Sequence, residues 1–328
     1  MAKVSERFLV TGAAGCIGAW AIRLLLDEGV DVLASDVSED LRRFRLVSHP
    51  RVDDVAFAAL DVTGTAEVAR VVREEEITHV VHLAGLQVPF CAANPPLGAM
   101  VNVVGNVNVF DAIRASGRSI GLAYASSAAV FGASSSYSGG VVSDTSPVMP
   151  DTHYGVYKVA NEGTARIYSM NNGIGSVGLR PFIVYGPGRD QGMTSDATKA
   201  IWAAVQGQPF HFKFGGNLLL TYAPDCARAF IDSARAAAGS GDALVLNVPG
   251  RRVGIAQLVD LIERLVPEAA GLLTWEDKPL MVPALLGASA LGDVVATVAN
   301  TPLEDGVRAT IEHFRRAVAD GVMDRAAP

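Results

Sequence analysis

The sequence predicts an α/β fold, in which a doubly wound parallel sheet carries helices on both faces. Three observations predict it. Short β-branched runs alternate with longer helical patterns through the first half of the chain, a glycine-rich turn joins the first strand to the first helix, and later segments continue the alternation. A break in the pattern near the middle of the chain predicts a second, smaller C-terminal region.

The elements of the first half are short and closely spaced. Gly29 is expected to end the first helix, because a residue without a side chain ends a helix at little cost. Strands are expected within residues 7–12, 30–36, 78–85 and 119–127, and helices within residues 19–29 and 102–117.

The pattern changes at residues 179–190, where two prolines and two glycines follow a strand-like start. We take this segment as the crossing into the second region. Residues 1–180 are then expected to form the sheet domain, with later returns near 217–250. The substrate-binding region is expected mainly in residues 181–216 and 251–328.

The second region has readable elements of its own. Residues 243–250 resemble a strand, and residues 253–266 have the period of an amphipathic helix. The last helix is expected to begin with Thr301 as its N-cap, with Glu304 completing a capping box. Residues 133–140, ASSSYSGG, form a flexible loop by composition, either a lid or a plain surface loop.

Composition excludes several classes of partner. The chain has 328 residues, a formal charge of −7 and dispersed Lys and Arg residues, so neither nucleic acid nor a membrane is expected to bind. Cys16, Cys91 and Cys226 are widely separated, which favours buried thiols over a disulfide. The N-terminus lacks the shape of a signal peptide, so a cytoplasmic location is expected. No metal-ligand spacing occurs, so no metal is predicted.

Tyr154 and Lys158 carry the chemistry that the sequence predicts. On a helix they share one face, and Ser127 lies upstream in YASSAAVFG. A phenol with a pKa of about 10 is a poor base at neutral pH, and a neighbouring ammonium favours its ionised form. A serine hydroxyl can hold a substrate oxygen against the tyrosine. The three residues suit proton transfer to or from an alcohol while a cofactor moves the hydride.

The turn TGAAGCIG predicts a phosphate-binding site. Gly12, Gly15 and Gly18 fall between the first strand and the first helix. Missing side chains there permit a tight turn, close approach of a phosphate, and packing of the helix on the strand. Because the strand–turn–helix context is right, a dinucleotide cofactor is expected.

Asp36 selects between the two nicotinamide cofactors. It ends the second strand, where a carboxylate accepts from the adenosine ribose hydroxyls and repels a ribose phosphate, so NAD is favoured over NADP. Arg42 and Arg43 follow soon after and weaken this preference. Asp61 is either a contact to the adenine edge or an acid at a helix N-terminus.

These motifs together resemble the extended short-chain dehydrogenase/reductase family of the NAD-dependent epimerase/dehydratase type. The resemblance covers nearly the whole chain. It implies a Rossmann domain that carries NAD, a smaller C-terminal substrate domain, and catalysis by Ser127, Tyr154 and Lys158. It also implies a homodimer formed through helices at 96–116 and 153–172. The segments that carry the resemblance are TGAAGCIG, Asp36, the Asp61–Val62 pair, HLAG, Asn102, YASSAAVFG, YGVYK, LRPFIVYGPG and TPLEDGVRATIEHF.

The resemblance implies roles for individual residues. Lys158 would bond the nicotinamide ribose and depress the pKa of Tyr154, which would be the acid/base. Ser127 would hold the substrate oxygen, and Ser126 is expected at the substrate with it. Judged from the residues alone, Gln87 follows HLAG and is expected to point to substrate. His153 either lines the site or belongs to the cap of its helix, and Arg189 either holds an anionic or hydroxyl-rich group or lies on the surface. The positions implied for the cofactor are Gly12, Gly15, Cys16, Ile17, Gly18, Asp36, Asp61, Val62, Leu83, Ala84, Gly85, Asn102, Tyr154, Lys158, Pro181 and Val184.

Some positions depart from the family pattern. HLAG stands where HLAA is commoner, and Tyr157 replaces a small residue and is expected to pack against the dimer or the sheet. Family members that bind a nucleotide diphosphate carry an Arg before the segment that here reads GGNLLLTYAPD, and a second Arg motif is missing near the C-terminus. Two phosphates without Arg partners are poorly compensated, so a nucleotide sugar is disfavoured.

Three functions remain open. The leading one is an NAD-dependent dehydrogenase that oxidises a secondary alcohol of a small sugar, sugar acid or related hydroxy compound. The second is a nucleotide-sugar epimerase, in which the hydride returns to the opposite face of a keto intermediate. The third is a catalytically idle NAD-binding regulator, which would not need Ser127, Tyr154 and Lys158 together.

Overall fold

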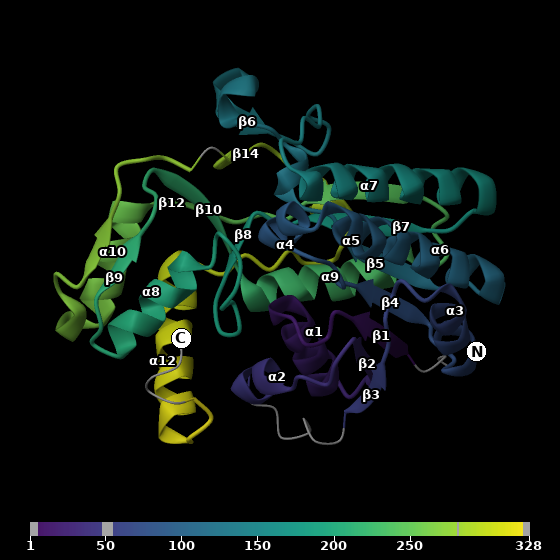
Figure 1. The fold of residues 1–328 in the computed structure, drawn as a ribbon, viewed down its shortest axis with the longest axis horizontal. Coiled ribbons are helices and arrows are strands. Elements are labelled where there is room, and N and C mark those ends of the chain that lie inside the picture. Colours follow the sequence, from purple (N-terminus) through teal and green to yellow (C-terminus); the bar gives the residue numbers. More distant parts are fainter. Residues whose placement is uncertain (1–5, 48–54, 281, 324–328) are drawn as a thin grey trace.

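The structure is a computed structural model, and it describes residues 6–47, 55–280 and 282–323. Within these residues the larger sheet has seven parallel strands in the order β11-β7-β5-β4-β1-β2-β3 (Figure 1). The predicted doubly wound α/β class is therefore confirmed. The strands are β1 (Arg7–Thr11), β2 (Asp31–Asp36), β3 (Ala56–Ala59), β4 (His79–His82), β5 (Gly121–Ala125), β7 (Ser176–Arg180) and β11 (Ala243–Asn247).

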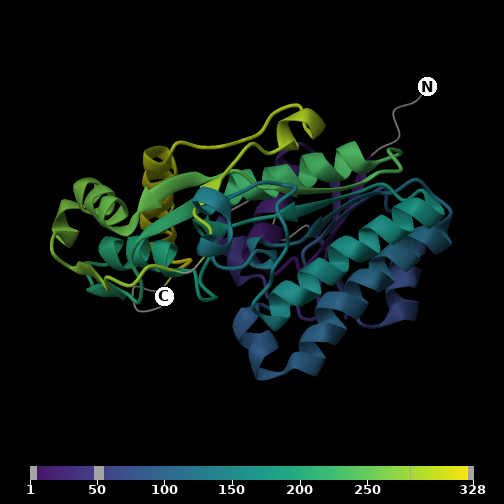
Figure 2. The ribbon, with the colours of Figure 1, turned by 90° about the horizontal axis from the view of Figure 1, so that it is seen from above.

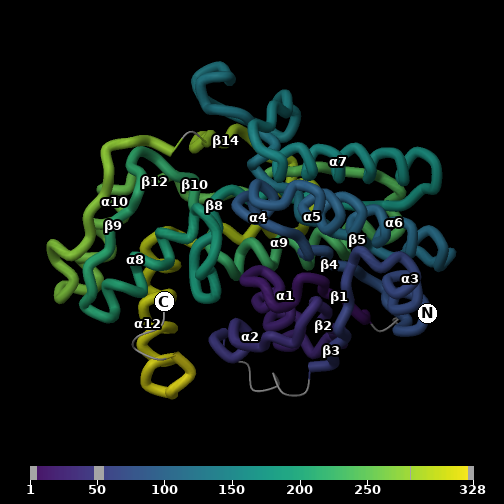
Figure 3. The backbone as a smooth tube through the Cα atoms, viewed as in Figure 1, coloured from purple at the N-terminus to yellow at the C-terminus, as the bar shows by residue number. Residues whose placement is uncertain are grey.

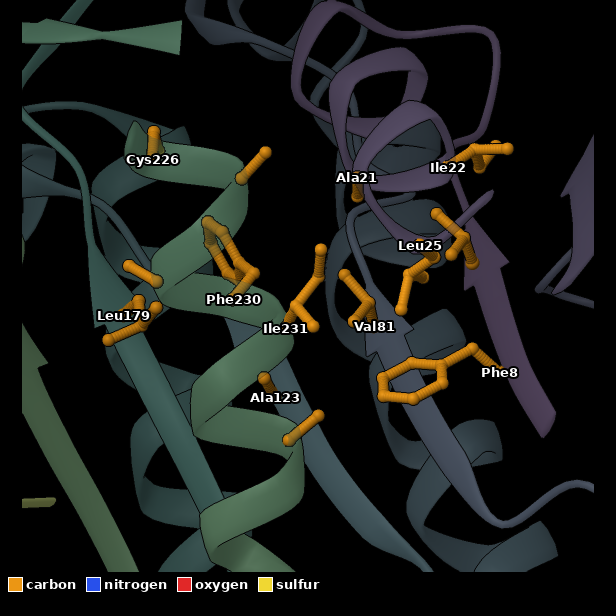
Figure 4. Packing of buried hydrophobic residues seen from close by; sticks show 14 of the residues in the cluster. Phe8, Ala21, Ile22, Leu25, Val81, Ala123, Leu179, Cys226, Phe230 and Ile231 are labelled. Carbon is orange, nitrogen blue, oxygen red and sulfur yellow. The ribbon is translucent and has the colours of Figure 1, made fainter. Parts of the chain in front are cut away.

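Helices cover both faces of this sheet (Figure 2). Phe8 and Val10 of β1 point into one helix layer and Leu9 into the other, as the alternation of a strand requires. Phe230 and Ile231 of α9 pack in the first layer with Leu25 of α1 (Figure 4). One layer holds α1 (Cys16–Asp27), α2 (Arg42–Val47) and α9 (Ala223–Ala237), and the other holds α3 (Thr65–Glu74), α6 (Gly105–Ser116) and α7 (His153–Asn172).

Short helices fill the edge of the sheet where the strands end. The chain between β4 and α6 forms α4 (Val88–Ala93), α5 (Pro95–Ala99) and a π-helical turn, η2 (Met100–Val104), that runs directly into α6. After β5 comes the 3-10 turn η3 (Ala128–Val130). A π turn inside a helix admits one extra residue and frequently occurs at a functional site.

The smaller region has its own sheet and its own core. Its sheet has the order β12-β10-β8, with the short pair β9 and β13 beside it. Residues 217–250 were expected to return to the sheet domain. Strand β10 belongs to the smaller sheet, so only α9 and β11 of this stretch pack on or join the seven-stranded sheet, which corrects part of that expectation. The elements are β8 (Ile183–Tyr185), α8 (Asp196–Val205), β9 (Phe210–Phe212), β10 (Asn217–Tyr222), β12 (Arg251–Gly254), α10 (Ile255–Leu265), η6 (Pro267–Ala269), β13 (Leu273–Trp275) and α12 (Leu303–Ala319).

Between β13 and α12 the chain crosses back to the large domain. Figure 3 shows this path through β14 (Leu285–Leu286), which pairs with β6 (Val141–Val142). The carboxylate of Asp144 accepts hydrogen bonds from the backbone N–H groups of Asn247 (2.6 Å) and Ala290 (2.8 Å), just before α11 (Leu291–Val294). This crossing segment ties the two regions together.

One expectation for local structure is wrong. Thr301 does not cap the last helix: Pro302 is the N-cap, and the backbone N–H and hydroxyl of Thr301 donate to Asp225 at 2.6 and 2.9 Å. The loop expected at residues 133–140 contains two 3-10 turns, η4 (Ser134–Ser136) and η5 (Ser138–Gly140). The buried ring of Tyr137 anchors them, because its hydroxyl donates to the Pro147 carbonyl at 3.0 Å.

No helix in the described part of the chain is long and apolar enough to span a membrane.

Candidate functional site

The glycine turn packs tightly at Gly12 and Gly18 and is less crowded at Gly15, where α1 begins. Gly12 has a φ of +69°, and a Cβ there would lie 2.6 Å from the backbone nitrogen of Ala84. A Cβ on Gly18 would lie 2.4 Å from the Gly12 carbonyl oxygen. Gly15 is the N-cap of α1, and a Cβ there would approach only the Gly12 carbonyl oxygen, at 3.1 Å. The N-terminus of α1 is therefore accessible to an anion, as a dinucleotide pyrophosphate requires.

Asp36 lies at the end of β2, beside this turn. Its carboxylate accepts from the backbone N–H groups of Ala14 (3.0 Å) and Val37 (2.8 Å). Each of the two arginines that weakened the preference for NAD pairs with a carboxylate other than Asp36: Arg42 with Asp40 at 2.7 Å, and Arg43, which also donates to the Ala14 carbonyl of the turn, with Asp190 at 2.6 Å. The Asp36 carboxylate therefore stays unneutralised beside the turn, so the site fits NAD.

The rest of the predicted cofactor positions line the same edge. Asp61 is exposed and accepts from the Thr63 backbone N–H at 2.9 Å, which is compatible with both of its expected roles. Val62 is buried against Gly105. Leu83, Ala84 and Gly85 follow β4, Cys16 and Ile17 begin α1, and Pro181 and Val184 flank the start of β8.

Asn102 lies in the π turn and is 1% exposed. Its amide nitrogen donates to the carbonyl oxygens of Gly98 (3.0 Å) and Leu86 (3.2 Å), while its Oδ1 atom is buried without a partner among the described residues. A Cβ on Gly85 would lie 2.7 Å from this Oδ1 and 3.5 Å from Nζ of Lys158. The glycine of HLAG therefore leaves room between Asn102 and Lys158.

Tyr154 and Lys158 both project from the start of α7, whose N-cap Thr152 accepts from the Gly155 backbone N–H at 3.1 Å. A Cβ on Gly155 would lie 2.2 Å from the Ala129 carbonyl oxygen, so only glycine lets α7 approach η3 this closely. This approach brings Tyr154 close to Ser127, whose hydroxyl acts to lower the pKa of the tyrosine. The structure thus joins the three predicted catalytic residues.

Lys158 is 4% exposed. Its Nζ donates to the Ala125 carbonyl oxygen at 2.8 Å and lies 5.4 Å from the centre of the Tyr154 ring. Burial lowers the pKa of Lys158 to about 8, and the neighbouring Cys91 opposes this shift.

Burial raises the pKa of Tyr154, and the hydrogen bond from Ser127 and the charge of Arg189 oppose that rise. The Lys158 ammonium, bonded to the Ala125 carbonyl, lies 5.4 Å from the centre of the same ring, so its role in favouring the phenolate stays a prediction.

The predicted substrate residues have different environments. Gln87 is the N-cap of α4, and its Oε1 is buried without a partner among the described residues. His153 is exposed at the start of α7 and borders a pocket of about 440 Å³ between α4 and α7. Arg189 donates weakly to Thr194 at 3.4 Å. Ser126 faces the interior, where its hydroxyl donates to Glu162 at 2.5 Å.

Sequence reasoning missed the network behind Ser126. Glu162 of α7 accepts from Arg180 at the end of β7 through two bonds, at 2.8 and 2.7 Å, and both side chains are buried. These bonds fasten the catalytic helix to the sheet. Glu162 follows Lys158 by four residues, but its partners come from distant strands, so no local spacing reveals the network.

Two other residues have defined environments. His82 is buried, its Nδ1 lies 2.7 Å from the Thr11 hydroxyl, and burial lowers its pKa to about 3. The hydroxyl of Tyr157 donates to the Pro95 carbonyl of α5 at 2.9 Å, and its packing against a dimer partner stays a prediction. No cluster of metal-binding side chains occurs in the described ranges.

Comparison with known proteins identifies the family. Residues 8–248 match the NAD dependent epimerase/dehydratase family. UDP-glucose 4-epimerase of Mycolicibacterium smegmatis is 27% identical over 94% of this chain and 98% of that protein. UDP-glucuronate 4-epimerase 3 of Arabidopsis thaliana is 29% identical over 76% of this chain and 58% of that protein. Among solved structures, MoeE5 in complex with UDP-glucose and NAD has a TM-score of 0.78 at 24% identity, covering 95% and 100% of the two chains. The chain therefore belongs to the NAD-dependent epimerase/dehydratase family and is an NAD-dependent enzyme of the short-chain dehydrogenase/reductase type.

Proposed function

We propose that the protein is an NAD-dependent sugar epimerase that inverts a secondary alcohol, with Tyr154 as the acid/base. The observation that carries this proposal is the meeting of Ser127, Tyr154 and Lys158 next to a turn that fits NAD, in a chain similar over 94% of its length to UDP-glucose 4-epimerase. These similarities favour the epimerase alternative over the dehydrogenase that the sequence put first. The idle regulator is disfavoured, because it would not need Ser127, Tyr154 and Lys158 together.

The residues of this chain move one proton. Ser127 orients the substrate hydroxyl, and Tyr154 takes its proton as the carbon–hydrogen bond breaks. NAD, when bound, supplies the hydride acceptor. Rotation of the keto sugar in the site, followed by reduction from the other face and return of the proton from Tyr154, gives the inverted alcohol. Lys158, whose Nζ lies 5.4 Å from the centre of the Tyr154 ring, would bond a ribose hydroxyl and keep positive charge near the tyrosine.

A dehydrogenase acting on a free sugar or sugar acid is the second candidate, and one observation favours it. Leu218, Leu219 and Leu220 stand where related enzymes that bind a nucleotide diphosphate carry an Arg, and all three are at most 4% exposed. They pack in β10 and offer no charge to a diphosphate.

We also propose a homodimer through α5, η2, α6 and α7. The support is a set of large apolar side chains that are exposed on α5, η2 and α7, since patches of this kind mark interfaces. They are Leu97 (49%), Met100 (46%), Val156 (51%), Ile167 (45%) and Met170 (68%). Light scattering coupled to gel filtration, compared with the 34.3 kDa chain mass, tests this state.

The function is tested by following NADH absorbance and epimer formation side by side, with UDP-sugars, free sugars and sugar acids. Inverted product without net NADH supports the epimerase, and stoichiometric NADH identifies the dehydrogenase. Tyr154→Phe should lower turnover about 10²-fold or more while NAD still binds. Turnover that survives this substitution would remove Tyr154 from the mechanism.

A further inference from the structure

The segment that follows β8 is fastened to the start of α1, next to the cofactor turn. The indole N–H of Trp20 donates to the Pro187 carbonyl oxygen at 2.9 Å, and the Cys16 thiol donates to the same oxygen at 3.7 Å. Gly188 has a φ of +88°, and a Cβ there would lie 3.7 Å from Sγ of Cys16. The first turn of α1 and the segment after β8 therefore lie against each other.

Arg43 of α2 bridges this contact. Its Nη2 and Nε atoms donate to one carboxylate oxygen of Asp190, at 2.6 and 3.1 Å, and Nε also donates to the Gly188 carbonyl oxygen at 3.1 Å. Its Nη1 donates to the Ala14 carbonyl oxygen of the turn at 2.8 Å. The side chain of Arg43 is 14% exposed, so these bonds are partly shielded from water. One guanidinium thus joins the cofactor turn to residues 188–190.

The Ala14 residue to which Arg43 donates is itself part of the cofactor site. Its backbone N–H donates to Asp36 at 3.0 Å, and the Asp36 carboxylate is the group expected to bind the adenosine ribose of NAD. Its carbonyl belongs to the peptide that leads into Gly15, the N-cap of α1, where the pyrophosphate is expected. A dinucleotide that fixes the orientation of these two peptides therefore also fixes an acceptor of Arg43.

The same segment also positions residues that are expected at the substrate. Gly192 has a φ of +96°, and a Cβ there would lie 2.3 Å from Oε1 of Gln87, so the backbone of this loop packs directly on the Gln87 side chain. Arg189 lies between the two residues that Arg43 holds. The positions of Gln87 and Arg189 thus depend on where residues 186–195 lie.

We propose that Arg43 is a positioning residue that couples the cofactor turn to residues 186–195, so that bound NAD stabilises the attached arrangement of this loop. In that arrangement Arg43 makes all four of its bonds, and a detached loop loses the three to Gly188 and Asp190. NAD favours attachment because it fixes the peptide that accepts the fourth bond. Coupling is reciprocal, so the attached loop strengthens NAD binding by the same factor.

Hydrogen–deuterium exchange of the full chain, measured by mass spectrometry without and with saturating NAD, tests this coupling and needs no substrate. In the loop, the Arg189 backbone N–H donates to the Gly186 carbonyl oxygen at 3.1 Å. For the wild type, NAD should slow exchange within residues 186–195 by about 10- to 100-fold, within the usual range of coupling between two sites. Arg43→Met should abolish this slowing, whereas residues 12–18 should still be protected by NAD, which shows that the variant is folded and occupied. Arg43→Lys keeps the charge and should restore part of the slowing.

Arg42→Met is the matched control. Arg42 is the neighbouring arginine of the same helix, its side chain is 75% exposed, and it pairs with Asp40 at 2.7 Å. The substitution removes the same charge and should leave protection of the loop unchanged.

Asp190→Ala separates the bridge from simple electrostatics. Removing a negative charge near the turn would tighten NAD binding through charge alone, whereas losing the bridge weakens it. Calorimetric titration with NAD should show binding weakened severalfold, and protection of the loop should fall with it. This variant tests the proposal even where Arg43→Met fails to fold.

Four results would overturn the proposal. Loop protection by NAD that survives Arg43→Met would mean that NAD acts on the loop by direct contact. Protection of residues 12–18 alone in the wild type would mean that turn and loop are not coupled. Tighter NAD binding by Asp190→Ala, or an equal loss of protection in Arg42→Met, would reduce the effect of Arg43 to its charge. The experiment follows no turnover, so its failure leaves the proposed epimerase untouched, and failure of the epimerase assay leaves the coupling untouched.

Discussion

Glu162→Gln should destabilise the protein far more than a surface substitution of the same kind. The side chains of Glu162 and Arg180 are 11% and 5% exposed, and Glu162 accepts three hydrogen bonds, from Ser126 (2.5 Å) and Arg180 (2.8 and 2.7 Å). The substitution keeps the shape but leaves the Arg180 charge buried without a counter-charge. Removing one partner of a buried ion pair costs about 3–5 kcal/mol, and the remaining amide oxygen places the expected loss near the lower end, about 3 kcal/mol.

Urea unfolding at neutral pH measures this loss from the shift in midpoint. Glu74→Gln is the matched control, because Glu74 pairs with Arg70 on the surface of α3 with half of both side chains exposed, and it should move the midpoint little. The double substitution Glu162→Leu with Arg180→Met removes both charges and should recover most of the stability. Equal midpoints for Glu162→Gln and Glu74→Gln would refute the reasoning, as would a double variant no more stable than the single one.

Two further predictions concern the cofactor turn and the catalytic lysine. Gly12→Ala should cost about 1–3 kcal/mol from its left-handed backbone alone and should weaken NAD binding, whereas Gly117→Ala, at a φ of +63° in open space, should show only the backbone cost. Equal urea midpoints for these two variants would contradict the close contact of Gly12 with Ala84. The pKa of Lys158 is about 8 in the folded protein and near its ordinary 10.5 in the unfolded chain. Below pH 8 Lys158 is charged in both states, so its buried charge destabilises the fold fully. Between pH 8 and pH 10.5 the unfolded chain binds more protons than the folded protein, so the stability of the fold rises with pH. Lys158→Met should therefore be more stable than the wild type at neutral pH, with a difference that closes by about pH 10.5, and a gap independent of pH would rule out the buried charge as its cause.

The sequence predicts those features that depend only on residues close together in the chain. Gly12 follows β1 and Gly18 lies in the first turn of α1, and their close contacts follow from those positions. The spacing of Tyr154 and Lys158 fixes a shared helix face, whatever the rest of the chain does. The fold class follows in the same way from a repeated local alternation.

Sequence reasoning failed where distant residues compete for one group. Thr301 has the sequence context of an N-cap, but Asp225, 76 residues earlier, takes both of its donors. Ser126 was expected against substrate, yet its hydroxyl turns inward to Glu162, whose place in space no spacing along the chain reveals.

The π turn at Met100–Val104 makes the length of this helix as important as its composition. Each residue of a helix turns it by about 100°, so the extra residue sets the faces of α5 and α6 out of phase by that angle. Deleting any one residue here would restore a regular helix and rotate either Asn102 away from Gly85 or Val109 and Phe110 out of the core. Substitutions on the outer face of this segment should be tolerated. An insertion or deletion of a single residue would displace side chains of the candidate site and of the core at once.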